Sequence, residues 1–207
     1  EAATMTRLTV ALATVLSLAF TPVAAQDFQK GMDALQSGDP SVAIRELLPL
    51  AKQGFGPAQA ILGSMFEYGL GITKDYDEAL KWYTFAAAQG EAPAQTNLGL
   101  MYYTGQGVSQ DYNMAALWFG AAAAQGVAKA QANLGIMYYN GQAFLQDDIM
   151  AHVWSNIAAA SGDENAMKLL KITTDRMRSA DISKAQAMAR ECNRLGYCLV
   201  WVFCVYT

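Results

Sequence analysis

The chain of 207 residues is long enough for one compact domain, and its formal net charge at pH 7 is −4. Lys and Arg form no basic run, so we expect neither nucleic acid nor an anionic membrane surface as a partner. The hydrophobic fraction of 53% comes largely from alanine, which favours closely packed helices over sheets.

Residues 1–25 have the pattern of an export signal with a few residues upstream of it. A positive charge at Arg7 precedes an apolar run over 8–20, and Val23 and Ala25 occupy the −3 and −1 positions of a cleavage site. The run is too short to span a bilayer comfortably. We therefore expect cleavage near Ala25 and a periplasmic or secreted mature chain without membrane insertion. A retained membrane anchor is the alternative.

Residues 26–54 predict a short pair of helices. The first is expected near 28–37, and Pro49 should kink the second. Asp39 and Gly54 lie 36 residues before residues of the same type in the next segment. The pair is therefore interpreted as a degraded first copy of the repeat that follows, as expected for the end of an array.

Residues 55–162 contain three tandem copies of a 36-residue repeat, over 55–90, 91–126 and 127–162. A fixed period of this length, with identical residues in every copy, is typical of a helical array. The nine positions that recur at this spacing are, in the first copy, Ala58, Leu62, Gly63, Gly69, Asp75, Ala79, Trp82, Ala86 and Gly90.

Each copy predicts two antiparallel helices. Asp75, Asp111 and Asp147 are expected as N-caps of the second helices, and Glu78 after Asp75 predicts a capping box. A glycine such as Gly90 is expected just past the end of each second helix. The predicted first helices cover 57–68, 93–104 and 129–140, and the second helices cover 76–89, 112–125 and 148–161.

Two residue types inside the helices predict how the copies pack. Glycine costs about 1 kcal/mol relative to alanine inside a helix. Its recurrence at one position therefore predicts that the backbone of a neighbouring helix comes too close for a Cβ atom. Tryptophan recurs on a helix face shared with alanines and is interpreted as a core anchor. The residues concerned are Gly63, Gly99, Gly135, Trp82, Trp118 and Trp154.

Residues 163–198 are expected to cap the array with two helices, over 163–177 and 180–195, the second with Ser179 as its N-cap. The apolar tail 199–207 could form a strand, cover the cap or stay disordered. The apolar stripe of the last helix comprises Ile182, Ala185, Ala189 and Cys192.

Three cysteines lie near the C-terminus, and export would place them in an oxidising compartment. A disulfide between Cys192 and Cys198 is the favoured pairing because it would hold the end of the last helix. Cys204 would then be left over.

The pattern A-x-x-x-L-G-x-M-[FY]-x-x-G, followed by the capping Asp, A-x-x-W and A-A-x-x-G, resembles the SEL-1-like repeat, a relative of the tetratricopeptide repeat. The whole layout looks like the small exported SEL-1-like proteins of Gram-negative bacteria. This resemblance implies an all-α, right-handed solenoid that acts as an adaptor or regulator through protein contacts, without a cofactor. A cysteine-rich branch with a β-lactam-hydrolase label carries cysteine pairs in its repeats, which this chain lacks before Cys192.

The first helices are expected to face the concave side of the solenoid, as in related solenoids. Positions that vary between copies at the groove-facing phase of these helices predict a surface for a peptide or an amphipathic helix. Burial of these side chains against a neighbouring helix or the cap is the alternative. The predicted groove residues are Ser64, Glu67, Asn97, Leu100, Tyr103, Asn133, Ile136 and Tyr139.

Catalytic patterns are weak, and we expect no enzyme, no metal site and a monomer. His152, the one histidine of the chain, is interpreted as a contact between repeats. The acidic pairs Asp147-Asp148 and Asp163-Glu164 stand at expected helix starts, where carboxylates stabilise the helix dipole. An envelope hydrolase of β-lactamase type and a structural subunit of a secretion or polysaccharide-export assembly are the alternatives to a binding scaffold.

Overall fold

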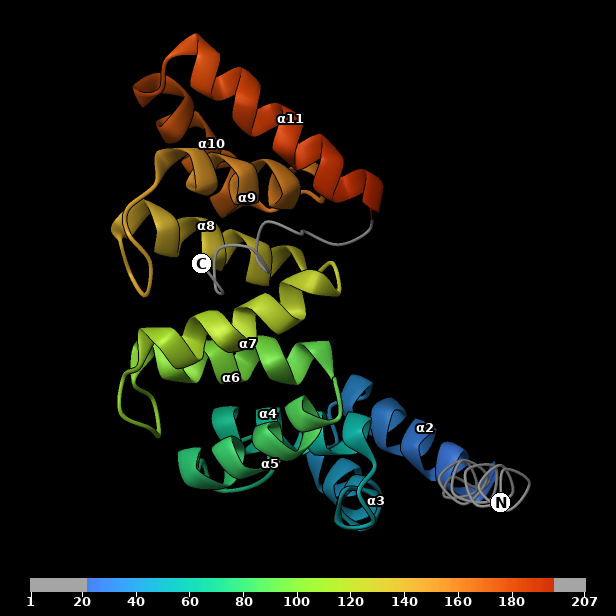
Figure 1. Ribbon diagram of the computed structural model, residues 1–207. Coiled ribbons are helices and arrows are strands. Elements are labelled where there is room, and N and C mark those ends of the chain that lie inside the picture. Colours follow the sequence, from blue (N-terminus) through green and yellow to red (C-terminus); the bar gives the residue numbers. More distant parts are fainter. Residues whose placement is uncertain (1–21, 196–207) are drawn as a thin grey trace, which may run out of the picture.

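The computed structural model describes residues 22–195, which form ten α-helices and, within that range, no β-strand. Helices that follow one another in the chain pack together, pair upon pair, into a curved stack from α2 to α11 (Figure 1). This confirms the predicted all-α solenoid. The helices are α2 (Pro22–Gln36), α3 (Pro40–Lys52), α4 (Gly56–Tyr68), α5 (Tyr76–Ala88), α6 (Ala92–Thr104), α7 (Tyr112–Ala124), α8 (Ala128–Asn140), α9 (Asp148–Ala160), α10 (Glu164–Arg176) and α11 (Ser179–Leu195).

Several predictions concern parts of the chain outside the described residues. They are the apolar run of the expected signal, the second cysteine of the favoured disulfide at Cys198, and the tail 199–207. The last residues of the predicted signal, from Pro22 to Ala25, form the beginning of α2. None of the described helices has both the length and the hydropathy needed to cross a bilayer.

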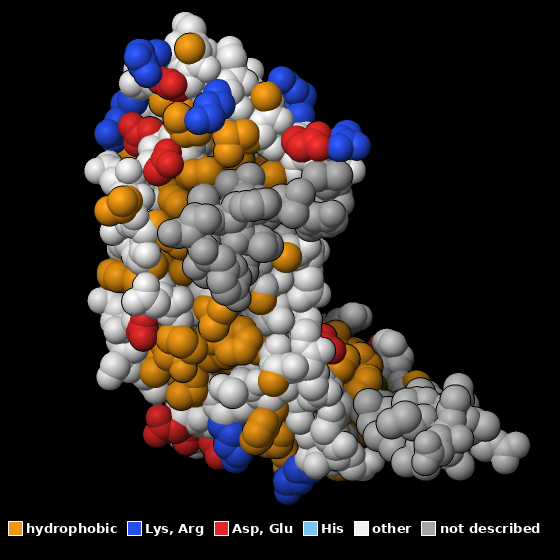
Figure 2. All heavy atoms as spheres, viewed as in Figure 1, with side chains coloured by type: hydrophobic (Ala, Val, Ile, Leu, Met, Phe, Trp, Pro, Cys, Tyr) orange, Lys and Arg blue, Asp and Glu red, His pale blue; other side chains and the backbone are white. Residues whose placement is uncertain are grey.

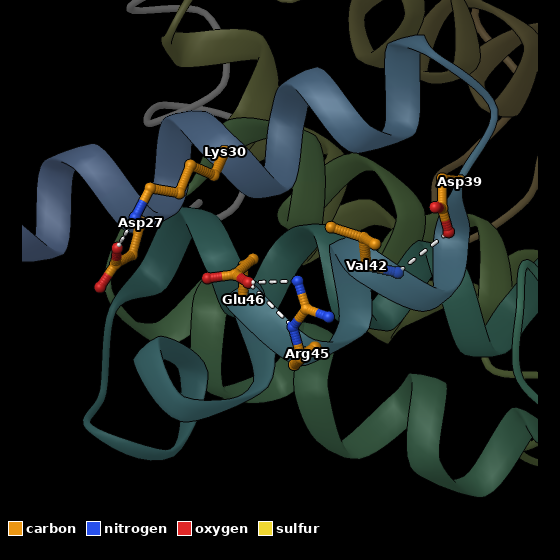
Figure 3. Close-up of polar contacts among 6 residues, drawn as sticks. All are labelled: Asp27, Lys30, Asp39, Val42, Arg45 and Glu46. Carbon is orange, nitrogen blue, oxygen red and sulfur yellow. Dashed lines mark hydrogen bonds and ion pairs between the residues drawn. The ribbon is translucent and has the colours of Figure 1, made fainter.

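The N-terminal pair, α2 and α3, is joined by a short turn. Asp39 begins α3 by accepting a hydrogen bond from the N–H of Val42 at 3.1 Å (Figure 3). Helix α3 continues through Pro49 to Lys52. The other polar contacts in Figure 3 are the exposed ion pairs Asp27–Lys30 and Arg45–Glu46, each within one helix. Apolar packing around the buried Leu47 therefore holds the two helices together.

The second helix of each repeat begins at the predicted aspartate. Asp75 accepts from the N–H groups of Asp77 (2.9 Å) and Glu78 (3.1 Å), and the same pattern recurs at Asp111 and Asp147. The predicted capping box is wrong. The N–H of Asp75 donates instead to the Phe66 carbonyl at 3.0 Å, and the Glu78 carboxylate pairs with Lys81. The backbone of α4 thus satisfies the donor that the box would have used.

The recurring glycines of α4, α6 and α8 lie against side chains rather than backbone in the first two repeats, which corrects the sequence prediction. A Cβ atom on Gly63 would lie 2.5 Å from the ring of Tyr83, and one on Gly99 would lie 2.6 Å from the ring of Phe119. In the third repeat a Cβ on Gly135 would lie 3.0 Å from the Ser155 hydroxyl and 3.3 Å from the Ala151 carbonyl, so the predicted close backbone is found there. In the first two repeats glycine instead makes room for an aromatic ring of the partner helix.

The tryptophans are core residues, as predicted. Trp82 and Trp154 are buried, and the half-buried Trp118 packs against a buried cluster. Their indole nitrogens make no hydrogen bond within the described part of the chain, so the rings contribute through apolar contact.

The loops of the first two repeats rest on the preceding pair of helices. A Cβ on Gly71 would lie 2.6 Å from the Cβ of Pro40, and one on Gly107 would lie 2.6 Å from the Cβ of Tyr76. Both glycines have φ of 68°, which also favours glycine. Ala143 holds the equivalent position in the third loop with φ of 63°.

Helices α10 and α11 cover the outer side of α9. One position of the second helices becomes more buried along the array. Lys81 of the first repeat is exposed, Leu117 of the second is 47% exposed, and Val153 of the third is 0% exposed. Val153 shares a core cluster with Ala185 and Ala189 of α11. The predicted cap is therefore present. Ser179 was predicted as the N-cap of α11, but the structure shifts the cap by one residue. The Arg178 carbonyl accepts the first hydrogen bonds of the helix, and Ser179 is already helical.

Candidate functional site

The predicted groove residues lie on α4, α6 and α8, the first helices of the three repeats, and we call this surface the helix-A face. Between α4 and α6 it is hollowed by a cleft of about 260 Å³. Two predicted residues, Ser64 and Asn97, line this cleft. The remaining lining residues are mostly apolar: Pro57, Ala60, Ile61, Glu91 and Pro93.

A hydrogen-bonded chain crosses the helix-A face beside the cleft. The buried hydroxyl of Tyr83 donates to the Glu67 carboxylate at 2.6 Å and accepts from the Asn97 amide at 3.0 Å. Burial, followed by the bond to Glu67, raises the pKa of Tyr83 above its usual range, so the phenol stays protonated. Glu67 and Asn97 therefore link α4, α5 and α6, a role that the sequence prediction did not include.

The two predicted tyrosines bridge each repeat to the next element. The Tyr103 hydroxyl donates to the Gln142 side chain at 3.0 Å, and its ring lies 5.5 Å from that of Tyr112. The guanidinium of Arg176 lies 5.1 Å from the ring centre of Tyr139 and pairs with Asp148 at 3.2 Å. Both tyrosines are half-buried, so part of each side chain serves the packing of the solenoid.

Three predicted residues remain, and none of them makes a bridge of this kind. Leu100 and Ile136 are half-buried at equivalent positions of α6 and α8. Asn133 corresponds to Asn97, which donates to the Tyr83 hydroxyl. For Asn133 the residue that corresponds to Tyr83 is Phe119, which has no hydroxyl, and the carboxamide of Asn133 makes no hydrogen bond to any described residue. A partner on the helix-A face would meet the cleft and these half-buried side chains.

The surface chemistry of the array changes along its length. Figure 2 shows hydrophobic side chains gathered near the level of α5 and α6 and again near α9 and α10, and charged side chains mainly toward the two ends of the array. Apolar surface is therefore not confined to one repeat.

His152 is a buried contact between the third repeat and the cap, whereas the prediction was a contact between repeats. Its Nδ1 lies 3.1 Å from the Thr173 hydroxyl of α10. The same hydroxyl lies 3.1 Å from the Leu169 carbonyl and 3.0 Å from the Leu170 carbonyl, so when it donates to either of them it accepts from Nδ1–H. Its Nε2 is buried without a partner among the described residues. The polar contacts of His152 in this part of the chain are with threonines, and none is with a carboxylate of the kind that orients a catalytic histidine.

The acidic pairs likewise serve the helix starts, as predicted. Asp147 and Asp163 accept backbone N–H bonds at the beginnings of α9 and α10. Asp148 is held by the ion pair with Arg176.

Burial makes His152 a source of pH-dependent stability. Desolvation lowers its pKa in the folded state below the ordinary value of 6.5. The unfolded chain then binds the proton more readily, so the free energy of unfolding should fall as pH drops from about 6.5 toward the folded pKa, by at most about 1.4 kcal/mol per pH unit. Urea unfolding followed by circular dichroism at several pH values measures this slope.

The matched variant for this measurement is His152→Leu, because leucine is the residue at the equivalent position of the first repeat, Leu80. Because the chain has one histidine, the variant should lose the slope just below pH 6.5. Equal slopes for the two proteins would contradict the assignment.

Comparison with known proteins shows that the fold and its repeat are those of a Sel1-type helical solenoid. The Sel1 repeat model matches residues 56–91, 92–127 and 128–163, and the chain belongs to the Sel1 repeat family. Proteins with this repeat are generally scaffolds for protein interactions and are typically non-catalytic. No curated protein matches the chain.

Two solved structures illustrate the likeness. The crystal structure of c5321, a protective antigen of uropathogenic Escherichia coli with an SLR fold, is 32% identical with a TM-score of 0.70, over 74% of this chain and 34% of that one. A Sel1 repeat protein from Oxalobacter formigenes is 31% identical with a TM-score of 0.66, over 73% of this chain and 61% of that one. This chain thus spans less than two thirds of either neighbour.

Proposed function

We propose that the protein is a non-catalytic scaffold or regulator of the cell envelope that binds a peptide or protein segment along the helix-A face. The observation that carries the proposal is the apolar cleft between α4 and α6. The half-buried Leu100, Asn133 and Ile136 occupy the corresponding positions on α6 and α8. Placement in the envelope rests on the export signal expected in residues 1–25, and the mature chain is proposed to act as a monomer without membrane insertion.

The lining of the cleft indicates what kind of segment would fit. Ser64 and Asn97 provide polar atoms at the edge of an otherwise apolar surface, a combination that suits an extended peptide or one face of a helix. The charged side chain among the lining residues is Glu91. A neutral or basic segment therefore fits better than an acidic one, because it avoids like-charge repulsion.

The test combines substitution with crosslinking. The variant Leu100→Ala, Tyr103→Ala, Ile136→Ala, Tyr139→Ala should abolish partner capture while the helical circular dichroism persists. Because both tyrosines also bridge repeats, the narrower pair Leu100→Ala and Ile136→Ala separates binding from packing. Capture is measured with a photo-crosslinking residue at Ser64 in intact cells, followed by mass spectrometry.

The matched control uses apolar residues of the second helices. Phe85 and Leu117 are 49% and 47% exposed, so Phe85→Ala with Leu117→Ala removes comparable apolar surface away from the helix-A face. Capture should survive this change. Undiminished capture by the helix-A variants, or a crosslink that forms equally well from position 117, would refute the proposed surface.

A further inference from the structure

A row of glutamines joins successive repeats along one edge of the solenoid. The buried Gln59 donates to the Ala51 carbonyl at 3.0 Å and accepts from the Gln89 amide at 2.7 Å. In the next repeat Gln95 donates to the Ala87 carbonyl at 3.2 Å, and its Oε1 accepts from Gln125 at 2.8 Å. Each of these two buried glutamines therefore has both its donor and its acceptor satisfied.

The third repeat breaks this row. Gln131 keeps the first bond, donating to the Ala123 carbonyl at 3.2 Å, so its side chain has the same orientation as its equivalents. Ser161 stands where the first two repeats have Gln89 and Gln125, and its side chain is too short to continue the row. As a result Gln131, only 6% exposed, has an Oε1 that is buried without a hydrogen-bond partner among the described residues.

A cavity of about 410 Å³ lies at this break. Gln131 and Ser161 both line it, together with residues of α7, α9 and α11. Trp154 also lines the cavity. Its unpaired indole nitrogen is no evidence for a ligand, because the indole nitrogens of Trp82 and Trp118 are also unpaired among the described residues. The lining residues are Ala123, Ala124, Gly126, Gln131, Trp154, Ile157, Ala160, Ser161, Cys192 and Asn193.

We propose that this cavity binds the carboxamide of a glutamine side chain presented by a partner peptide. The amide N–H would donate to Oε1 of Gln131, as Gln89 and Gln125 donate to its equivalents within the chain. The cavity is also large enough for a side chain with adjoining backbone. This site is separate from the helix-A face and does not depend on the function proposed there.

The lining favours a carboxamide over other hydrogen-bond donors. Alanines, Ile157 and Trp154 form an apolar wall, and none of the lining residues is an aspartate or glutamate that could neutralise a lysine or arginine. A lysine or arginine side chain would find no carboxylate among the lining residues with which to pair. A neutral amide can instead satisfy Gln131, and Asn193 offers a further polar group at the same cavity.

The probe is N-acetyl-glutamine N-methylamide, titrated into the intact protein and followed by the side-chain amide resonances of Gln131. We expect saturable shifts with this probe and binding weaker by about tenfold or more, which corresponds to ~1.4 kcal/mol, for the methionine and glutamate analogues. The Gln131→Met variant keeps the volume but removes the acceptor, so the indole resonance of Trp154 should no longer respond.

Ser161→Gln is the decisive variant, because it restores the row from within the chain. It should raise the melting temperature and abolish probe binding, whereas Ser161→Ala should leave binding intact. Absence of saturable shifts in the unmodified protein, or equal shifts in Ser161→Gln, would overturn the proposal. Should Ser161→Gln fail to fold, unchanged binding by Gln131→Met would overturn it equally. Because these changes spare the helix-A face, crosslinking from Ser64 tests the other site separately.

Discussion

Replacement of Val153 with lysine is expected to lower the free energy of unfolding by about 4 kcal/mol, because it buries an ammonium group without a partner. Val153 is 0% exposed between α9 and the cap. Lysine at this position is compatible with the repeat itself, since Lys81 holds it in the first copy. The penalty would therefore measure the cover that α10 and α11 provide. Chemical denaturation followed by circular dichroism gives the value.

Leu117→Lys is the matched control, because Leu117 occupies the same position of the second repeat and is 47% exposed. Its effect should stay within about 0.5 kcal/mol, as for other surface changes. Similar losses for the two variants would contradict the packing of the cap on α9.

Gly99→Ala should destabilise the protein by about 2 kcal/mol, although alanine is the better helix former by about 1 kcal/mol. The new methyl group would lie 2.6 Å from the ring of Phe119, and this ring is fully buried and cannot move aside without displacing its neighbours. Thermal and chemical unfolding of the purified variant measure the change.

Gly135→Ala provides the comparison within the same chain. There the methyl group meets the Ser155 hydroxyl at 3.0 Å and the Ala151 carbonyl at 3.3 Å, and the hydroxyl can rotate away. The helix-propensity gain then offsets much of the strain, and the net effect should be below about 1 kcal/mol. A Gly99→Ala protein that is more stable than the parent would show that the ring of Phe119 does not set the spacing.

The repeat units and their helix ends were predictable because local chemistry determines them. Asp75 and its equivalents cap helices with their own side chains, and Gly90 has the positive φ expected just past a helix end. The predicted and observed ends of the repeat helices agree to within a residue, as these local determinants require. The 36-residue period was predictable because identical residues, such as Trp82 and Trp118, recur at this spacing.

Contacts between repeats were less predictable, because their partners lie far along the chain. The recurrence of Gly63 showed that something comes close, but not that it is the ring of Tyr83. The bond between Tyr103 and Gln142 joins residues 39 apart and depends on how a loop folds back. The glutamine row did leave a signal in the sequence: Gln89 and Gln125 are followed at the same spacing by Ser161. Only the structure shows that this difference leaves an acceptor unpaired.

The loops differ in how much extra chain they could accommodate. Gly71 and Gly107 bring their loops against the preceding pair of helices, so added residues there would push successive repeats apart. In the third loop Ala143 replaces that glycine, and Leu145 is 92% exposed. Insertions are tolerated best at exposed loop tips. Gln142 and Phe144 tie the rest of the third loop to Tyr103 and Tyr138, so the exposed Leu145 is the point where this array can acquire a new segment, such as an epitope or a reporter domain, with least effect on its pitch.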